Sequence, residues 1–266
     1  TPNLTLTSST SSAKDVVIVY DDFAKKLDDC GREYNTFRTY TVAIATDNVT
    51  LSNITIANSN TKPSVVGQCV ALSVCGSNFV ADNCIFTSTQ DTLFCAPLPD
   101  DLVIRYLDFL PTNLNYIEGE TVQKYINCTI VGSVDFIFGC ANALFLKCNI
   151  VSINCGESWS YVVAPAHSLK QTIGFVFVEC DFTSSSCSEK SVYLARPWRD
   201  FGLASFIKCS FGSHISDLGF DKWNDTDRDR TARFYIYSSS TLQHLVKWAR
   251  TLNDIEAKNL LEYFQL

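Results

Sequence analysis

The sequence predicts an all-β protein built as a right-handed parallel β-helix, a solenoid in which each coil of the chain stacks on the one before. Three observations predict it: one register of apolar residues recurs in six copies, one corner position accompanies every copy, and the copies differ in length by insertions. The alternative is a β-sandwich with a strand roughly every 8–12 residues. A sandwich gives no reason for six copies in one register, so the solenoid is favoured.

The register is marked by a zero position that is followed two places later by a large apolar residue. The zero positions are Ile54, Cys84, Cys128, Cys148, Cys180 and Cys209. The large residues are Ile56, Phe86, Ile130, Ile150, Phe182 and Phe211. A third apolar set lies three places before zero, at Leu51, Ala81, Tyr125, Phe145, Phe177 and Phe206. Successive zero positions are 30, 44, 20, 32 and 29 residues apart, which is one coil each with loops of variable length on one side.

A corner is expected just before each zero position. Residues on one face of a strand are separated by an even number, yet the sets at −3 and 0 are both apolar and differ in parity. The chain must therefore turn between them. The residues at −1 are Asn53, Asn83, Asn127, Lys147, Glu179 and Lys208. Asn tolerates the left-handed backbone conformation better than most residues, which suits a corner.

Two segments depart from the register. The interval between Cys84 and Cys128 is about 20 residues longer than a coil needs, which predicts a long loop over Cys95–Glu120 that leaves the solenoid and forms a cleft wall. The repeat is expected to stop after about Thr231, and the tail Thr241–Leu266 has helix-like apolar spacing. We expect this C-terminal helical tail to pack on the outside or the end of the solenoid, and residues 1–266 to form a single domain.

Composition excludes several classes of protein. Of the 266 residues 46% are apolar and 18% charged, as in ordinary globular proteins. No apolar run approaches the roughly 18 residues of a membrane-spanning helix, so no membrane partner is expected. The net charge of −7 argues against a nucleic-acid surface. We expect a monomer.

The twelve cysteines would suggest disulfides in a secreted protein. Five of them, however, occupy the zero position of the register beside apolar residues. We interpret most of them as buried free thiols that act as small hydrophobic residues. No Cys-x-x-Cys pair occurs and only three His are present, so no metal site is expected.

Three short clusters place functional groups where a solenoid strand does not need them. The groups are Gln68, Gln90, Asp91 and Asp135, and a matching cation is available in Arg196. Residues at similar places on successive coils meet, so all five could form one patch. Two close carboxylates do not both ionise readily, which favours one nucleophile and one acid/base, with Arg holding one of them ionised and Gln amides suited to an oxyanion. A turn aspartate and a structural Arg–Asp bridge remain an alternative.

These clusters resemble, in the same order, the signature segments of the pectin methylesterase (pectinesterase) family. Residues 67–72 are similar to the family's Gln-Ala-Val-Ala-Leu motif and residues 90–94 to its Gln-Asp-Thr-Leu-Tyr motif. Residues 132–139 are similar to Gly-x-Val-Asp-Phe-Ile-Phe-Gly and residues 195–198 to Gly-Arg-Pro-Trp. The resemblance covers nearly the whole chain and implies the pectin lyase-like form of the β-helix.

The resemblance implies hydrolysis of the methyl esters of galacturonate residues in pectin, releasing methanol and leaving pectate. Carried over residue by residue, it makes Asp135 the nucleophile and Asp91 the acid/base. Gln68 and Gln90 would stabilise the oxyanion, and Arg196 would hydrogen-bond Asp135. The groove for galacturonate rings would be lined by Trp198, Phe138 and Phe94. The resemblance implies no metal or cofactor, methyl-esterified homogalacturonan as the partner, and a secreted, extracellular protein.

The chain departs from the family pattern within the motifs and at its start. Ala is replaced by Cys69, Tyr by Phe94, Asn by Cys140 and Gly by Ala195, and none of these changes removes a functional group assigned above. The family's first coil, with a Gly-x-Tyr-x-Glu segment, has no counterpart, so we expect an N-terminally incomplete solenoid with its first coil missing.

Two other functions remain open. A polysaccharide lyase or glycoside hydrolase on the same scaffold would need an acidic calcium site or carboxylates that flank a glycosidic bond. The one acidic cluster, residues 221–229, is interpreted as a solvated loop. A non-catalytic pectin-binding relative is the second alternative, favoured only by the missing first coil.

Overall fold

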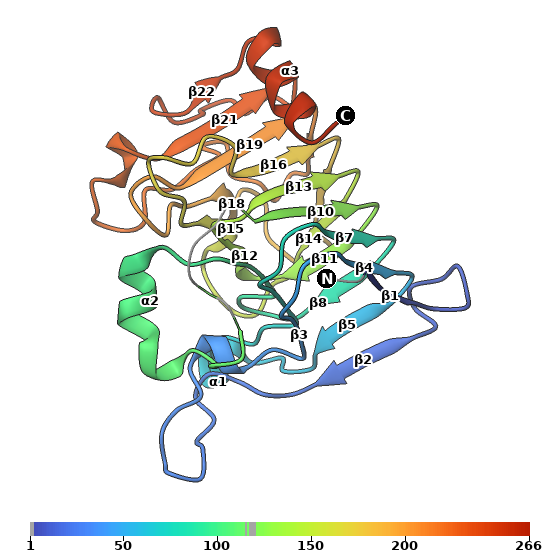
Figure 1. Cartoon of the computed structure of the whole chain (residues 1–266). Helices are drawn as coiled ribbons and strands as arrows, with labels where there is room; N and C mark the ends of the chain where they lie inside the picture. The colour runs from blue at the N-terminus through green and yellow to red at the C-terminus, as the bar shows by residue number, and fades with distance from the viewer. Residues whose placement is uncertain (1–2, 115, 117–120) are drawn as a thin grey trace.

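The computed structural model describes residues 3–114, 116 and 121–266, which wind into three parallel sheets (Figure 1). The nine-stranded sheet has the order β1 (Leu4–Thr7), β4 (Val49–Ser52), β7 (Phe79–Asp82), β10 (Val122–Ile126), β13 (Asn142–Leu146), β16 (Phe175–Val178), β19 (Leu203–Ile207), β21 (Arg233–Tyr237) and β22 (Arg250–Thr251). The seven-stranded sheet has the order β2 (Val17–Tyr20), β5 (Thr55–Asn58), β8 (Ile85–Thr87), β11 (Thr129–Gly132), β14 (Asn149–Ser152), β17 (Asp181–Thr183) and β20 (Ser210–Phe211). The six-stranded sheet has the order β18 (Val192–Ala195), β15 (Ser160–Pro165), β12 (Val134–Gly139), β9 (Leu93–Cys95), β6 (Leu72–Val74) and β3 (Val42–Ile44). The predicted right-handed parallel β-helix is confirmed.

The predicted corners lie between the nine-stranded and the seven-stranded sheet. All six residues at the −1 position have a left-handed backbone, with φ between 49° and 56°. Corner asparagines also bond between coils: Nδ2 of Asn83 donates to Oδ1 of Asn53 over 2.7 Å, and Nδ2 of Asn127 donates to Oδ1 of Asp82 over 3.3 Å. The parity argument made from sequence is therefore correct about where the chain turns.

The interior of the coils is filled by the stacked copies of the register. Rings at the −3 position lie nearly parallel, with centroids 4.9 Å apart for Tyr125 and Phe145, 4.4 Å for Phe145 and Phe177, and 5.1 Å for Phe177 and Phe206. The five in-register thiols are buried, and none of the chain's twelve cysteines, all of which lie in the described residues, is bridged. Each of these thiols packs as a small apolar group and donates weakly to a carbonyl, as Cys180 does to Phe145 O over 3.2 Å.

The long insertion is more ordered than a loop. Within it, α2 (Asp100–Tyr106) and the 3₁₀ turn η2 (Leu107–Phe109) lie over the outer face of the six-stranded sheet, where Leu102 and Val103 join a buried apolar cluster with Phe94 and Phe138. Positions 115 and 117–120 of the predicted loop lie outside the described residues. The remaining short helices are α1 (Pro63–Val66), η1 (Thr36–Arg38) and η3 (Arg228–Arg230).

The C-terminal tail corrects the sequence prediction in two places. The repeat does not stop at Thr231, because β21 and β22 still add to the nine-stranded sheet. The helix α3 (Asp254–Tyr263) begins only at a capping box formed by Asn253 and Glu256. Ile255, which the spacing placed on the apolar face, is 71% exposed. The tail still packs as expected, since α3 covers the outside of the nine-stranded sheet and Trp248 closes the end of the core against Phe234.

Candidate active site

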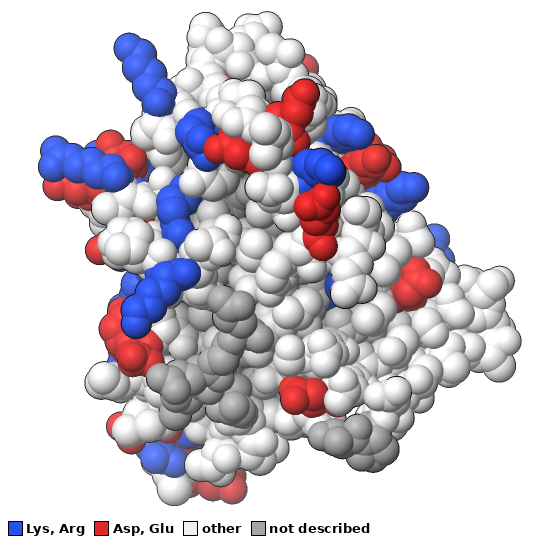
Figure 2. All heavy atoms as spheres, turned by 45° about the horizontal axis from the view of Figure 1, so that its top comes forward, with Lys and Arg blue, Asp and Glu red and all other residues white. Residues whose placement is uncertain are grey.

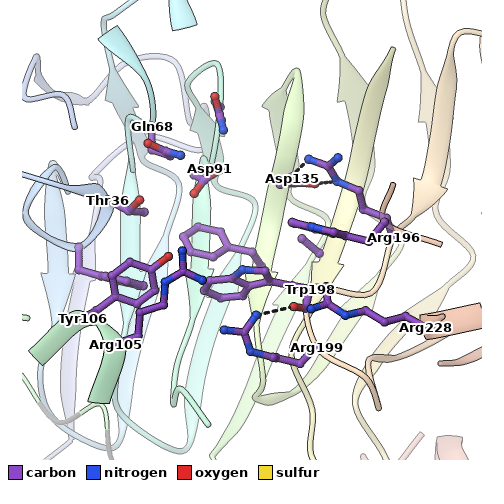
Figure 3. Close-up of a pocket in the computed structure, with 15 residues that line it drawn as sticks. Thr36, Gln68, Asp91, Arg105, Tyr106, Asp135, Arg196, Trp198, Arg199 and Arg228 are labelled. Atoms are coloured by element: carbon purple, nitrogen blue, oxygen red, sulfur yellow. Dashed lines mark hydrogen bonds and ion pairs between the residues drawn. The ribbon is translucent and has the colours of Figure 1, made fainter. Parts of the chain in front are cut away.

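A cavity of about 350 Å³ lies on the outer face of the six-stranded sheet (Figure 3). Strand register builds its floor, because Phe138 of β12 pairs with Ala164 of β15, and β18 ends one residue before Arg196 in the next coil. The turn η1 contributes Thr36 and Phe37 to the wall, and helix α2 contributes two further residues. The cavity therefore combines positions fixed by the solenoid with segments that leave it.

The two candidate aspartates lie on neighbouring coils. Strands β9 and β12 pair Leu93 with Ile137, and Asp91 and Asp135 each stand two residues earlier. The amide N–H of Asp91 donates to Val134 O over 3.0 Å, which holds the two turns together. Both aspartates have a left-handed backbone, with φ of 63° and 50°, and both are buried, at 8% and 7% exposure. Figure 3 shows both side chains directed into the cavity.

Arg196 binds Asp135 through two parallel hydrogen bonds. Nε donates to Oδ1 over 2.8 Å and Nη2 to Oδ2 over 2.6 Å, the fork geometry that guanidinium and carboxylate share. The guanidinium lies between two rings, 3.7 Å from the centroid of Tyr161 and 4.1 Å from that of Trp223. Its plane is thus fixed on both faces while its edge binds the carboxylate.

The surroundings of Asp91 raise the pKa of its carboxyl group. Burial raises the pKa of Asp91 well above its ordinary value, and the charge of Asp135 raises it further. The charge of Arg196 and a hydrogen bond from Gln90 act in the opposite direction without cancelling the rise. The pair therefore consists of Asp135, which is bound by arginine, and Asp91, which keeps its proton to a higher pH than an ordinary aspartate does.

The two glutamines lie on the Asp91 side of the cavity. Gln68 and Gln90 both line it, from adjacent coils joined by a 3.0 Å hydrogen bond from Cys69 N to Gln90 O. Figure 3 shows Gln68 beside Asp91. Two neutral amide groups therefore border the space in front of the carboxyl pair.

The aromatic residues predicted for the groove differ in position. Phe138 and Trp198 line the cavity and meet edge to face, with centroids 5.9 Å apart. Phe94 does not line it: the ring is 1% exposed, lies beside its strand partner Phe138 at 5.0 Å and is contacted by Phe37 of η1 at 5.2 Å. The sequence prediction is wrong for Phe94 because residues outside the repeat cover it, so it supports the wall and cannot touch a ligand.

Several lining residues were missed by sequence reasoning. They are Thr36, Phe37, Arg105, Tyr106, Ala164, Arg199, Trp223 and Arg228. Arg105 and Tyr106 belong to the insertion Cys95–Glu120. The prediction that this insertion forms a cleft wall could have identified them as lining residues. The segment 221–229 was interpreted as a solvated loop, and this is wrong for Trp223 and Arg228, whose side chains turn inward while the acidic side chains of Asp225 and Asp227 remain in solvent.

Within the described ranges, no helix is long and apolar enough to cross a membrane. The same part of the chain contains no cluster of three or more His, Cys, Asp or Glu side chains arranged to hold a metal ion.

Solved structures of known function share this fold. Pectin methylesterase PemA from Erwinia chrysanthemi superposes with a TM-score of 0.77 at 25% identity, over 97% of this chain and 82% of that one. The pectin methylesterase from carrot superposes with a TM-score of 0.75 at 21% identity, over 92% and 72%. The second likeness concerns the fold alone.

Sequence comparison gives the family. Pectinesterase 31 of Arabidopsis thaliana is 29% identical over 86% of this chain and 64% of its own length, and pectinesterase QRT1 of the same plant is 28% identical over 98% and 63%. The chain thus spans less than two thirds of the length of these relatives. The family model for pectinesterase matches residues 116–263, more than half of the 266 residues. The chain belongs to the pectinesterase family.

Proposed function

We propose that this protein hydrolyses the methyl esters of galacturonate residues in pectin, releasing methanol and leaving pectate. One observation carries the proposal: a buried carboxyl pair in which Arg196 binds one member in a fork while the pKa of the other is raised. Such an asymmetric pair suits ester hydrolysis by an aspartate nucleophile and an aspartate acid/base.

In the first half of the proposed reaction, an Oδ atom of Asp135 attacks the ester carbonyl carbon. The tetrahedral oxyanion is stabilised by the amide N–H groups of Gln68 and Gln90. When it collapses, the bond to the methoxy oxygen breaks and Asp91 gives that oxygen its proton, so methanol leaves. The product is an acyl anhydride between Asp135 and the galacturonate carboxyl group, beside an ionised Asp91.

In the second half, Asp91 takes a proton from a water molecule, whose oxygen attacks the anhydride. The bond to Asp135 breaks, its carboxylate returns to the fork of Arg196, and the galacturonate leaves as a free acid. Asp91 is protonated again and the cycle is closed. All atoms are supplied by ester, water and the two aspartates, and no cofactor enters.

The remaining parts of the proposal concern the substrate and its setting. Trp198 offers a ring face on which a galacturonate ring can pack, and Phe138, which is 2% exposed, supports Trp198 edge to face. A polymeric pectin substrate would place the working protein outside the cell, and we propose that it acts as a monomer.

The test is product analysis on highly methylated pectin. We expect methanol release without new unsaturated or reducing ends. Unsaturated ends would indicate a lyase and reducing ends a glycoside hydrolase. Binding of pectin with no product at all would indicate a non-catalytic relative, and each of these three outcomes would overturn the proposal.

A further inference from the structure

We propose that Cys155 and Cys187 are a dithiol pair that closes into a stabilising disulfide when a low-molecular-weight disulfide is present. The bond joins two loops on neighbouring coils, residues 153–159 and 184–191, which connect the seven-stranded to the six-stranded sheet. We refer to them as the paired loops. The inference does not depend on the proposed function, whose mechanism uses neither thiol.

The register of the coils gives the two cysteines equivalent positions. Before the paired loops, β14 and β17 pair residues that are 32 apart, as Asn149 with Asp181. After the loops, β15 and β18 pair residues that are again 32 apart, from Ser160 onward. The loops therefore have the same length, and Cys155 and Cys187 are themselves 32 residues apart.

Contacts between the paired loops show that the coils stay stacked there. The amide N–H of Asn154 donates to Oγ of Ser186 over 3.0 Å, and these two residues immediately precede the cysteines. At the far end of the loops, the amide N–H of Ser160 donates to Ser191 O over 3.1 Å. Stacked parallel segments hold equivalent Cα atoms about 4.8 Å apart, within the range of about 4.4–6.8 Å that a disulfide requires.

The corner that the paired loops occupy is shorter on the adjacent coils. On the preceding coil, Ser133 alone separates β11 from β12. On the following coil, β20 ends at Phe211 and Ile215 already bridges to Val192 of β18. The paired loops therefore protrude together as a two-layered corner, and a covalent bond between them fastens a part of the solenoid that the neighbouring coils brace least.

The exposure of the two thiols suits exchange with a small reagent. Cys155 and Cys187 are half-buried, whereas the five in-register thiols are buried. Burial raises the pKa of the Cys155 thiol, and negative charge on Glu157 or Cys187 raises it further. Cys155 therefore ionises less readily than an ordinary cysteine, so we expect Cys187 to attack the reagent first.

The exchange takes two balanced steps. The thiolate of Cys187 attacks one sulfur of the reagent, which forms a mixed disulfide and releases one reagent thiolate. The thiolate of Cys155 then attacks Sγ of Cys187, which forms the protein disulfide and releases the second reagent thiolate. Two protein thiols lose their protons and are oxidised, and one reagent disulfide is reduced to two thiols. The first step also removes the charge of the Cys187 thiolate, which favours ionisation of Cys155 for the second step.

The bond would fasten two strands that position Arg196. Each of the paired loops leads directly into one of them, β15 or β18. Tyr161 of β15 pairs with Tyr193 of β18, and the ring of Tyr161 lies 3.7 Å from the guanidinium of Arg196. Closing the disulfide should therefore make the separation of β15 from β18 harder. Disulfides persist in oxidising surroundings outside the cell, where we propose that the protein works.

The first measurement maps the thiols after native protein has been incubated with hydroxyethyl disulfide. This reagent is uncharged, which suits a chain of net charge −7 whose acidic and basic side chains are interspersed over the face shown in Figure 2. Free thiols are then blocked, and peptides from chymotrypsin, which cuts after Phe182 and so separates Cys180 from Cys187, are identified by mass spectrometry.

We expect the wild type to give a crosslink between the peptides that contain Cys155 and Cys187. In Cys155→Ser the crosslink should be lost, and Cys187 should keep the reagent as a mixed disulfide. The matched control is Cys30, an exposed thiol of the same chain, which should keep the reagent in both proteins. Reagent retained on Cys187 in the wild type, or both thiols left unmodified while Cys30 reacts, would overturn the pair.

The second measurement is the melting temperature with and without dithiothreitol. The oxidised wild type should melt about 5–10 °C above the reduced protein, because the bond restricts the unfolded chain between residues 155 and 187. Cys187→Ala should melt at the same temperature in both conditions, and Cys30→Ala should keep the difference. Equal melting temperatures for oxidised and reduced wild type would overturn the stabilising bond, whether or not the protein releases methanol from pectin.

Discussion

The corners of the coils and the two buried aspartates share one backbone conformation in opposite environments. Asn83, Asn127 and Lys147 have φ between 49° and 52° and side chains in solvent. Asp91 and Asp135 have φ of 63° and 50° and are less than a tenth exposed. At the corners the conformation is tolerated by asparagine and recurs at the same position in six coils. At the aspartates it is combined with a buried carboxyl group, so two unfavourable features coincide.

The difference teaches how to tell structural from functional strain in a repeat protein. A left-handed residue that recurs in register and faces solvent only turns the chain. A left-handed residue that is found at this position on two neighbouring coils, carries a titratable group and is buried beside an arginine has no such explanation. The following predictions test whether the two sets really differ in this way.

The largest effect is expected for Asp135→Asn. The amide keeps the size and the left-handed preference of the side chain but cannot supply the attacking oxygen, so methanol release should fall by about 10⁴-fold or more, roughly 5 kcal/mol of transition-state stabilisation. The measurement is kcat on methylated pectin, with circular dichroism to check folding. Asn127→Asp is the matched control, because it makes the reverse exchange at a corner and should leave kcat unchanged; a similar loss in both variants would contradict the distinction.

A smaller loss is expected for Arg196→Lys. The positive charge stays, but the planar fork and its contacts with the rings of Tyr161 and Trp223 are lost, so kcat/KM should fall by about 10²-fold. Arg230→Lys is the control, because Arg230 is 76% exposed and does not line the cavity, and it should keep the wild-type kcat/KM. Undiminished activity in Arg196→Lys would mean that charge alone, without geometry, orients Asp135.

The pH dependence of activity tests the same arginine through its neighbour. Asp91 must carry a proton when methanol leaves, so activity should decline as pH rises through its raised pKa. The charge of Arg196 lowers that pKa. Removing the charge in Arg196→Gln should therefore move the alkaline limb of the residual activity to higher pH, whereas Arg196→Lys should not. An alkaline limb at the same pH in both variants would show that Arg196 does not act on Asp91.

Sequence reasoning was reliable where the chain repeats and weaker where it does not. The corners, the ring stack from Tyr125 to Phe206 and the thiol column follow from register, since each coil repeats the same local geometry. The convergence of Asp91, Asp135 and Arg196 also followed, because similar places on successive coils must meet. Their catalytic roles remain a proposal.

The failures share one physical cause, which is contact between the solenoid and segments that leave it. Phe94 is hidden by Phe37, which no register relates to it. Arg228 reaches the cavity only because its segment folds back and donates to Pro197 O. The apolar spacing of the tail predicted helix-like structure from Thr241, whereas α3 begins only at Asp254, after the capping box. Long-range packing decides each of these, and no periodicity encodes it.

A gain in stability at neutral pH is expected for Asp91→Asn. The folded protein resists ionisation of Asp91, so the wild type is destabilised as pH rises from the ordinary value of 3.8, where the unfolded chain ionises, toward the raised pKa of the folded state. The variant does not titrate there and should melt at a higher temperature at pH 7. Below pH 3.8 the advantage should disappear; an advantage of equal size at both pH values would assign it to something other than the buried charge.

The smallest effect is expected at a corner, for Lys147→Asn. Lys147 has φ of 52°, a conformation costing roughly 1–2 kcal/mol for most L-residues and less for asparagine. The exchange also removes an ion pair with Glu179, but the atoms are 3.8 Å apart and the side chains 61% and 46% exposed, so that loss should be a few tenths of a kcal/mol. The net result should be a gain of about 0.5 kcal/mol in the free energy of unfolding, measured by urea denaturation. Lys14→Asn, at an exposed lysine without positive φ, should show no gain. If Lys147→Asn is no more stable than wild type while Lys147→Gly is, then relief of left-handed strain requires glycine, and the asparagines of the earlier coils are favoured for side-chain hydrogen bonds such as that from Asn83 to Asn53.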